Sequence, residues 1–400
     1  MTDWAEGSVS IRIVEGHMQS RTAPERPRVL LLIKCLGYGG AERLLVDIAA
    51  HRDRENFEYE VAYVLGQEDA LVPAMQETGV AVHCLGAKNN WDLRWLGALR
   101  RLLVDGRFDI VHTHLPLAAA LARPVVASLP RRGRPLLVYT EHSMWDKMAL
   151  LVKALNRTTI GLDRALVVVS ESARDALPPV LRRRARVVVH GVDLERSEQM
   201  MSLRDSVRDD VRSEFGISPA ERLVLTVANL RPEKGYDVLL ESARLLAETG
   251  EPVRVVAVGR GPLRDELEER RRALGLGDRF VFAGQRDDAL RLMAGADLFV
   301  LASRQEGLPV ALMEAASVGL PIVATTVGEI PRLFTSDLDA VLVPPENAEA
   351  LAAAIARVAA DESLRGRLGR GAAELSAIFD VAKATKEIES LYSEVLEGGR

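Results

Sequence analysis

The chain has 400 residues, of which 48% are hydrophobic and 27% charged, and its formal net charge is −5. This length exceeds one typical hydrophobic core and suits two domains, and the overall charge gives no indication of a nucleic-acid partner. No apolar run approaches the roughly 20 residues of a membrane-spanning helix. Residues 1–26 are polar and irregular and lack the apolar segment of a signal peptide, so we expect a disordered tail there.

Short apolar runs alternate with helical patterns from Arg28 onward. The run RVLLLIKC suits a strand buried on both faces, and the stretch AERLLVDIAAHR that follows LGYGG has helical spacing. This alternation predicts a parallel sheet with helices on both faces. Further strands of this half are predicted at EYEVAYVL, VAVHCL, FDIVHTH, PLLVYT, RALVVVS and RVVVH.

The composition turns polar between Asp193 and Ala220, where we expect an inter-domain linker. The alternating pattern then restarts, and helices from Asn347 onward close the chain. We predict two doubly wound, Rossmann-like α/β domains that face a central cleft at the carboxyl ends of their strands, where such folds bind ligands. Strands of the second half are predicted at RLVLTVANL, VRVVAVG, RFVFAG, DLFVLAS, PIVAT and AVLVP.

Two cysteines, Cys35 and Cys84, lie in or beside apolar strand-like runs, and no Cys/His cluster has zinc spacing. We expect both to be buried, reduced thiols in a cytoplasmic protein.

Positive charge is concentrated between Arg94 and Arg186, where 17 Lys/Arg stand against 7 Asp/Glu. The excess is either an ordinary solvated surface or a face that meets anionic lipid headgroups or an anionic acceptor. The second interpretation would bring the protein to the inner face of the plasma membrane. Local clusters are Arg100-Arg101, Arg131-Arg132-Gly133-Arg134 and Arg182-Arg183-Arg184.

Two acids stand with seven residues between them in SRQEGLPVALMEAASVG, Glu306 before a predicted helix and Glu314 within it. Pro309 suits the first helical turn, so the free N–H groups around Gly307 to Val310 would favour an anion, typically a phosphate. Glu306 could accept hydrogen bonds from sugar hydroxyls, and Glu314 two bonds from the cis-diol of a ribose. The alternatives are a capping acid at Glu306 and a surface acid at Glu314.

The stretch DLFVLASRQEGLPVALMEAASVGLPIVATTVGEIPRL resembles glycosyltransferase family 4, whose retaining enzymes carry this Glu-x7-Glu spacing on the GT-B fold. GYGGAER, ANLRPEKGYDVLLESA, VVAVGRGPLRDELEE and FAGQRDDALRLMAGAD also match family patterns, so the resemblance covers about Arg28 to Leu396. It implies an acceptor-binding domain over 27–200, a nucleotide-sugar-binding domain over 201–378, and a last helix, 379–400, that packs back on the first domain.

The resemblance also implies the roles of residues in the second domain. Glu314 would hold the nucleotide ribose and Glu306 the donor sugar, while Lys234, at a predicted strand end, would neutralise the leaving diphosphate. The backbone of Gly307, Leu308, Pro309 and Val310 would lie beside the diphosphate. Gly259 and Arg260 after one strand, and Gln285 and Arg286 after the next, would reach the nucleotide.

The sequence departs from the commonest family pattern at Asn229, where many members have an arginine five residues before the lysine. Asparagine carries no positive charge. We expect Arg231 to supply the missing guanidinium, with Asn229 still lining the site.

Residues of the first domain complete the predicted site. GYGGAER is either a tight strand–helix connection or, as the resemblance implies, a turn in which Gly39 and Gly40 let the domain approach the donor. His112 and His114 end one predicted strand with period-2 spacing, and His142 follows the next. Each could be a packing histidine, but all three lie at predicted strand ends, and the resemblance favours His114 near the acceptor or the donor sugar. We therefore assign His114 to catalysis and the other two to acceptor binding.

We therefore expect a retaining glycosyltransferase that moves a sugar from a nucleotide-diphosphate-sugar to a saccharide or lipid-linked acceptor. Family members generally need no metal, and Asp337-Leu338-Asp339 is interpreted as a turn. The alternatives are a nucleotide-sugar epimerase of the same fold and a catalytically silent nucleotide-sugar-binding subunit. The sequence does not indicate which nucleotide, sugar or acceptor is used.

Overall fold

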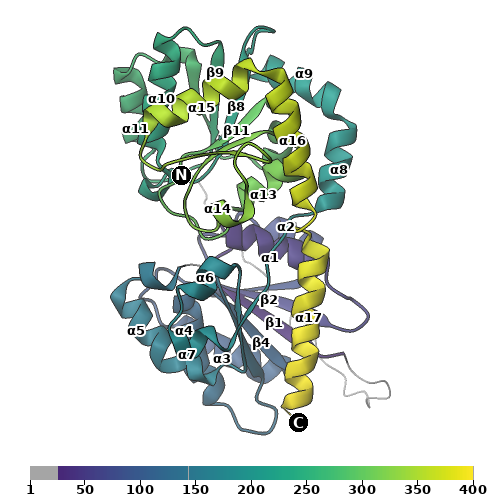
Figure 1. Cartoon of the computed structure of the whole chain (residues 1–400). Coiled ribbons are helices and arrows are strands. Elements are labelled where there is room, and N and C mark those ends of the chain that lie inside the picture. Colours follow the sequence, from purple (N-terminus) through teal and green to yellow (C-terminus); the bar gives the residue numbers. More distant parts are fainter. Residues whose placement is uncertain (1–25, 143, 400) are drawn as a thin grey trace, which may run out of the picture.

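The computed structural model describes residues 26–142 and 144–399, so the tail predicted at residues 1–26 lies outside the described residues except for Arg26. The chain forms two α/β lobes stacked one above the other, each with its own parallel sheet (Figure 1). This confirms the predicted fold class.

The N-terminal domain is built on a seven-stranded parallel sheet with the order β3-β2-β1-β4-β5-β6-β7. Its central strands are buried on both faces, which is why they appear in the sequence as continuous apolar runs. The strands are β1 (Arg28–Ile33), β2 (Glu58–Leu65), β3 (Ala81–Ala87), β4 (Ile110–His114), β5 (Leu136–Glu141), β6 (Ala165–Val168) and β7 (Ala185–Val187).

Helices follow most of these strands and cover both faces of the sheet. They are α1 (Gly40–Ala50), α2 (Val72–Glu77), α3 (Trp95–Gly106), α4 (Pro116–Ala127), α5 (Leu150–Thr159), α6 (Glu171–Asp175) and α7 (Pro179–Arg182), with 3-10 turns at Trp145–Lys147 and Ile160–Leu162.

The C-terminal domain repeats this design on a six-stranded parallel sheet with the order β10-β9-β8-β11-β12-β13. Its strands are β8 (Arg222–Val227), β9 (Val253–Val258), β10 (Phe280–Gly284), β11 (Leu298–Leu301), β12 (Ile322–Thr325) and β13 (Val341–Val343). Its helices are α8 (Leu194–Ser202), α9 (Arg204–Glu214), α10 (Tyr236–Glu248), α11 (Arg264–Ala273), α12 (Ala289–Gly295), α13 (Val310–Ser317), α14 (Ile330–Leu333), α15 (Ala348–Ala360) and α16 (Glu362–Ser376), with 3-10 turns at Pro232–Lys234 and Gly277–Arg279.

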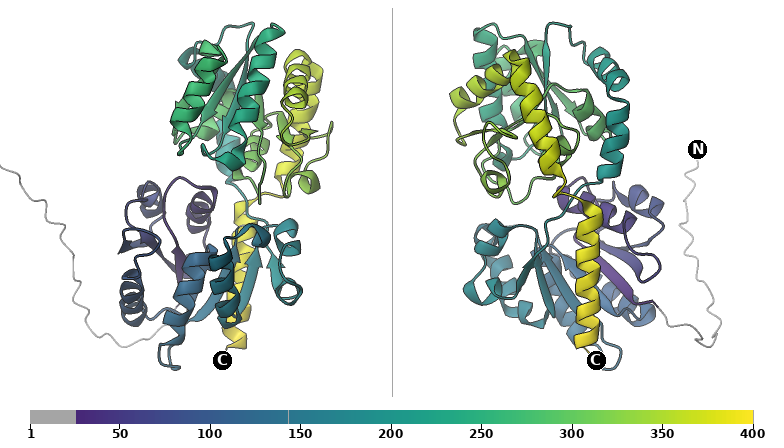
Figure 2. Two further views of the ribbon diagram at one scale, coloured as in Figure 1. Left: turned by 90° about the vertical axis from the view of Figure 1, so that its left-hand side faces the viewer. Right: turned by 45° about the vertical axis from the view of Figure 1, so that its right-hand side comes forward.

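The chain crosses between the domains at two adjacent points. On the way out, Val192 donates its N–H to the carbonyl of Phe379 at 2.8 Å, and on the way back Val381 donates to Val192 at 3.2 Å. The last helix, α17 (Val381–Gly398), then runs down the N-terminal domain (Figure 2). Its residues Ile388 and Tyr392 are fully buried in that domain's core.

Two expectations differ from the structure. The stretch from Asp193 to Ala220, expected as a linker, is largely helical: α8 and α9 pack on the C-terminal core, and Val207 and Val211 bury one face of α9. Cys84 is exposed rather than buried, because β3 is the edge strand of its sheet, whereas Cys35 is buried as predicted.

The domains also touch on the side of the cleft nearest α6. The backbone N–H of Ser172 donates to the Glu329 carboxylate at 2.8 Å, and Arg332 pairs with Asp175 at 2.9 Å. Among residues 26–142 and 144–399, no helix combines the length and hydropathy needed to span a bilayer.

Candidate active site

A cavity of about 510 Å³ lies between the domains at the carboxyl ends of both sheets. Its walls meet where the N-terminus of α1 approaches the N-terminus of α13. A Cβ at Gly40 would lie 3.1 Å from Cγ2 of Val310, so a larger residue there would crowd this close approach. The sequence-predicted residues that line the cavity are Gly39, Gly40, Asn229, Lys234, Gly259, Gln285, Arg286, Glu306, Pro309, Val310 and Glu314.

Lys234 and Glu306 form an ion pair at one end of this cavity. The Lys234 ammonium donates to Oε1 of Glu306 at 2.7 Å, and Ser303 Oγ donates to the same oxygen at 2.6 Å. Lys234 follows β8 and Glu306 follows β11, which are neighbouring strands, so their loops meet at one edge of the sheet. Only 7% of the Glu306 side chain is exposed, so its charge depends on these partners.

The turn that carries Lys234 is fixed to the Glu306 loop by backbone and side-chain contacts. Gly235 has φ +64°, and a Cβ there would lie 2.1 Å from the carbonyl oxygen of Ala302. Arg304, which we did not single out from the sequence, donates to the Pro232 carbonyl at 2.8 Å and to Asp237 at 2.6 Å. The pair is therefore held by the scaffold rather than by its own attraction alone.

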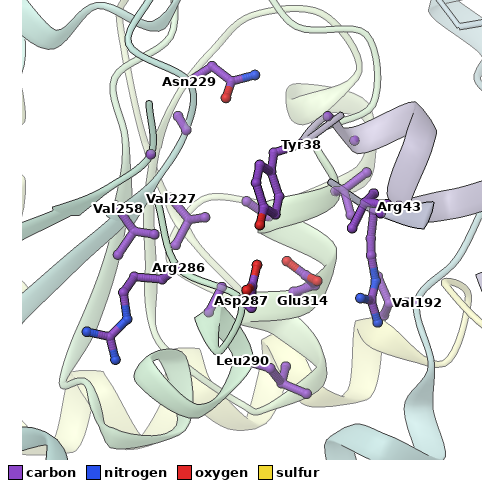
Figure 3. A pocket seen from close by; sticks show the side chains of 18 of the residues that line it. Tyr38, Arg43, Val192, Val227, Asn229, Val258, Arg286, Asp287, Leu290 and Glu314 are labelled. Atoms are coloured by element: carbon purple, nitrogen blue, oxygen red, sulfur yellow. The ribbon is translucent and has the colours of Figure 1, made fainter. Parts of the chain in front are cut away.

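Glu314 points into the same cavity from α13 (Figure 3). Burial raises the pKa of its carboxyl to about 7, an effect that Asp47 increases and that the nearby guanidinium groups of Arg43 and Arg196 oppose. The site thus holds two acids in different surroundings. Glu306 is paired with a lysine, whereas Glu314 has a pKa close to neutral pH.

The N-terminus of α13 lies between these two acids. The helix begins at Val310, with Pro309 as the N-cap rather than in the first turn. Gly307 and Leu308 do not line the cavity. Gly307 instead lies against the other domain, where a Cβ would be 3.0 Å from the His142 carbonyl oxygen.

The three predicted histidines, His112, His114 and His142, lie close together in the N-terminal domain and do not line the cavity. The rings of His112 and His114 lie on one side of β4 with centroids 4.3 Å apart, and Nδ1 of His114 is 3.0 Å from Nε2 of His142. His190, which we did not predict, packs edge-on against His142.

These rings form a neutral, largely buried group. Burial lowers the pKa values of His112, His114 and His142 well below their usual range, and that of His190 to about 4. His112 is tied to Tyr392 of α17 and to Thr140 at 2.7 Å. Among the described residues, Nε2 of His114 has no hydrogen-bond partner. This nitrogen is therefore free to make one further polar contact.

Arg231 and Arg260 are both exposed and do not line the cavity. Arg231 precedes the 3-10 turn that ends at Lys234, and its N–H donates to the Asn229 carbonyl at 2.8 Å. Arg260 lies over the ring of Tyr38 at 5.2 Å from the ring centroid. Arg286 lines the cavity but is bound to Asp288 at 2.8 Å and to Glu214 at 2.6 Å.

Several lining residues escaped the sequence reasoning. Arg43, Asp47, Asp193 and Arg196 form a charged group around Glu314, and Arg43 pairs with Asp47 at 3.3 Å. The i, i+4 spacing of Arg43 and Asp47, on the helix after the glycine-rich turn, could have indicated this pair from the sequence. Tyr38 and Asp287 had no comparable signal, because they meet only across the cleft.

Asp337-Leu338-Asp339 forms a turn whose carboxylates have protein partners: Asp339 accepts from the Thr335 N–H at 2.7 Å, and Asp337 accepts from Arg357. Within the described part of the chain, no group of three or more His, Cys, Asp or Glu side chains is arranged to hold a metal ion.

Comparison with known proteins agrees with this geometry. Residues 38–196 match the family described as Glycosyltransferase Family 4, and residues 207–375 match Glycosyl transferases group 1. The chain is 30% identical over 329 residues to the D-inositol 3-phosphate glycosyltransferase of Saccharomonospora viridis, covering 74% of this chain and 72% of that protein. The chain therefore belongs to glycosyltransferase family 4.

Other relatives cover similar shares. Identity to the alpha-D-kanosaminyltransferase of Streptomyces kanamyceticus is 27%, over 61% of this chain and 64% of the relative, which is slightly less than two thirds of its length. The chain is also 25% identical to the Escherichia coli UDP-Gal:alpha-D-GlcNAc-diphosphoundecaprenol alpha-1,3-galactosyltransferase. This match covers 76% of the present chain and 80% of that protein. The crystal structure of Anabaena HepE with UDP-glucose shares the fold, with a TM-score of 0.77 at 21% sequence identity. The superposition covers 92% of the present chain and 99% of the HepE chain.

Proposed function

We propose that this protein is a retaining glycosyltransferase that transfers a sugar from a nucleotide-diphosphate-sugar to an acceptor hydroxyl. The observation that carries the proposal is the grouping of the Lys234–Glu306 pair, the N-terminus of α13 and Glu314 within one cavity. The Glu306 carboxylate suits a sugar, Lys234 together with the helix N-terminus suits a diphosphate, and the Glu314 carboxylate suits a ribose.

In this proposal the C-terminal domain binds the donor. Glu314 accepts hydrogen bonds from the ribose diol, and the N–H groups at the start of α13 receive the diphosphate. Glu306 orients the donor sugar, while Asn229, Gly259, Gln285 and Arg286 complete the walls. Gly39 and Gly40 allow the N-terminal domain to approach the donor.

Bond cleavage at the anomeric carbon leaves negative charge on the departing diphosphate. Lys234 stabilises that charge together with the helix N-terminus, and Arg231, exposed on the same turn, can extend over a diphosphate at the cavity mouth. The acceptor hydroxyl attacks from the face that the diphosphate leaves, which retains the configuration, and the departing phosphate takes the hydroxyl proton. Closure of the domains excludes water and limits donor hydrolysis.

The N-terminal domain contributes the acceptor side. Nε2 of His114 is buried and has no hydrogen-bond partner among the described residues, and the neutral ring would accept a hydrogen bond from a sugar hydroxyl, or donate one to it, in a conformation that opens the acceptor side. His112 and His142 hold that ring from two sides. None of these steps assigns a role to a metal ion.

We further propose a lipid-linked acceptor at an anionic membrane surface on the cytoplasmic side. One relative acts on a diphosphoundecaprenol-linked sugar, as its name states. On this chain, α5 exposes 86% of Leu150 and 54% of Leu151 beside Lys147 and Arg157. Exposed leucines flanked by basic residues on an amphipathic helix suit the interface of an anionic bilayer.

A nucleotide screen tests the donor assignment. Thermal shift with UDP, GDP, ADP and their sugars should single out one nucleotide, and Glu314→Ala should weaken its binding. Nuclear magnetic resonance of the product's anomeric proton should show the donor's configuration. Inversion would rule out retention, and a donor converted to an epimer without acceptor would indicate an epimerase.

The membrane assignment needs a separate measurement. Co-sedimentation with vesicles of 30% phosphatidylglycerol should fall when salt is raised and when Leu150 and Leu151 are changed together to Ser. No binding at low salt would contradict it. Leu338, exposed by 61% on the other domain, provides the control: Leu338→Ser should leave vesicle binding unchanged.

A further inference from the structure

Tyr38 reaches across the cleft from the glycine-rich turn of the N-terminal domain. Its hydroxyl lies near the Asp287 carboxylate, and burial together with that carboxylate raises the pKa of the hydroxyl. Arg260 lies over its ring with the guanidinium carbon 5.2 Å from the centroid. Asp287 and Arg260 both belong to the C-terminal domain. Figure 3 shows the Tyr38 side chain extending into the cavity with its hydroxyl directed toward Asp287.

The two faces of this ring have different surroundings. Tyr38 lines the cavity, whereas Arg260 does not. Arg260 therefore supports the ring from outside the cavity, and the aromatic surface of Tyr38 forms part of the cavity wall. A tyrosine ring supported on one face by a guanidinium offers a flat surface on the other, suited to a flat ligand group.

Strand order locates this wall along the donor site. Glu306 follows β11, Lys234 follows β8, Arg260 follows β9 and Asp287 follows β10, and these strands are successive neighbours in the sheet. The sugar and diphosphate groups assigned to Glu306 and Lys234 thus lie at one end of this series. Tyr38 contacts the residues at the other end, where the group farthest from the sugar would lie.

We propose that the ring of Tyr38 stacks on the nucleobase of the donor, which makes this residue a donor-binding residue. Asp287 and Arg260 act as positioning residues that hold the ring. The inference rests on the proposed function, because a nucleobase is expected here only if the cavity binds a nucleotide. It assigns the N-terminal domain a direct part in donor recognition, beyond the backbone approach at Gly39 and Gly40.

The experiment compares ligands with and without a base on the full-length protein. Calorimetry with UDP, GDP and ADP first identifies the tightest nucleotide for the wild type, and displacement then gives the inhibition constant of inorganic pyrophosphate. Tyr38→Ala should weaken nucleotide binding about 5- to 100-fold, the range expected for loss of one base–aromatic stack. Tyr38→Phe should stay within about threefold because it keeps the ring.

Pyrophosphate separates stacking from mere closure of the domains. Its inhibition constant should change less than about threefold in Tyr38→Ala, because it has no base to stack. Equal losses for nucleotide and pyrophosphate, or no loss for either, would overturn the inference. Failure of the wild type to bind any nucleoside diphosphate would instead overturn the proposed function.

A second variant keeps the test valid if Tyr38→Ala does not fold, as judged by circular dichroism. Arg260→Ala removes the exposed support of the ring without touching the cavity lining. It should weaken the nucleotide about two- to tenfold, with pyrophosphate again unaffected. Unchanged nucleotide affinity in this variant, combined with a misfolded Tyr38→Ala, would count against the inference.

Discussion

The ammonium of Lys234 lies 2.7 Å from Oε1 of Glu306, although the two residues come from different loops of the C-terminal domain. Each was assigned to the site from a separate motif, and the neighbouring positions of β8 and β11 bring the motifs together. Before donor binds, the pair neutralises itself. In the proposed mechanism, a donor would share the lysine with Glu306, which would keep the cation fixed where the leaving charge develops.

Lys234→Ala should lower kcat about 10²- to 10³-fold, the usual loss on removing one preorganised electrostatic contact to a transition state. Nucleotide affinity should change much less. Steady-state rates together with calorimetry check this split. Because the variant leaves Glu306 without its cation, Lys234→Ala/Glu306→Gln serves as the control, and recovery of the rate in the double variant would contradict the assigned role.

Nucleotide affinity should rise about tenfold between pH 6 and pH 8 if ionised Glu314 binds the ribose, because its pKa of about 7 lies in this window. Calorimetry across this range measures the effect. Glu314→Gln removes the titrating group while the nucleotide's own ionisation is common to both proteins. Parallel profiles for the two proteins would exclude the ribose role.

The same carboxyl should affect stability without ligand. Its folded pKa is raised above the ordinary value of 4.5, so the folded protein holds the extra proton and loses stability as the pH rises from about 4.5 through 7. Glu314→Gln should therefore gain about 1–3 kcal/mol in unfolding free energy relative to wild type between pH 5 and pH 8. Denaturant unfolding at both pH values measures this. A constant difference would mean that burial does not perturb the group.

Gly235→Ala should destabilise the protein by more than about 2 kcal/mol, because it combines φ +64° with a Cβ placed 2.1 Å from the Ala302 carbonyl oxygen. Gly250→Ala is the matched control, since Gly250 has φ +76° but no atom within 4 Å of the added Cβ. It should cost about 1 kcal/mol from backbone strain alone. Thermal unfolding compares them, and equal losses would show that the close contact is not what fixes the Lys234 turn.

The sheets and the acid pair could be predicted from the sequence because their signals are local. All thirteen predicted strands occur. The strands that are buried on both faces were the clearest, because they appear in the sequence as continuous apolar runs. The prediction of a linker after Asp193 was wrong because α9 buries only a narrow apolar stripe. Val207 and Val211 form that stripe and were the only indication of a helix in the sequence. The prediction that Cys84 is buried was wrong because β3 is an edge strand. Whether a strand lies at an edge depends on the order of strands in the sheet, which the local sequence does not determine.

Residues that meet only through tertiary structure were beyond sequence reasoning. Tyr38 and Asp287 are far apart in sequence and come together because the glycine turn of one domain faces the β10 loop of the other. Arg304 looked like a surface residue in SRQEG but bridges two loops. Arg231 was expected in the cavity, whereas the structure has its side chain exposed outside the lining.

The position of α17 has a consequence for synthesis. Ile388 and Tyr392 complete the core of the N-terminal domain, yet they are made after the whole of the C-terminal domain. The N-terminal lobe must therefore wait, with part of its core open, until the whole C-terminal lobe has been translated. A truncation that removes α17 from Ile388 onward would damage the N-terminal lobe, although it leaves that lobe's own sheet intact.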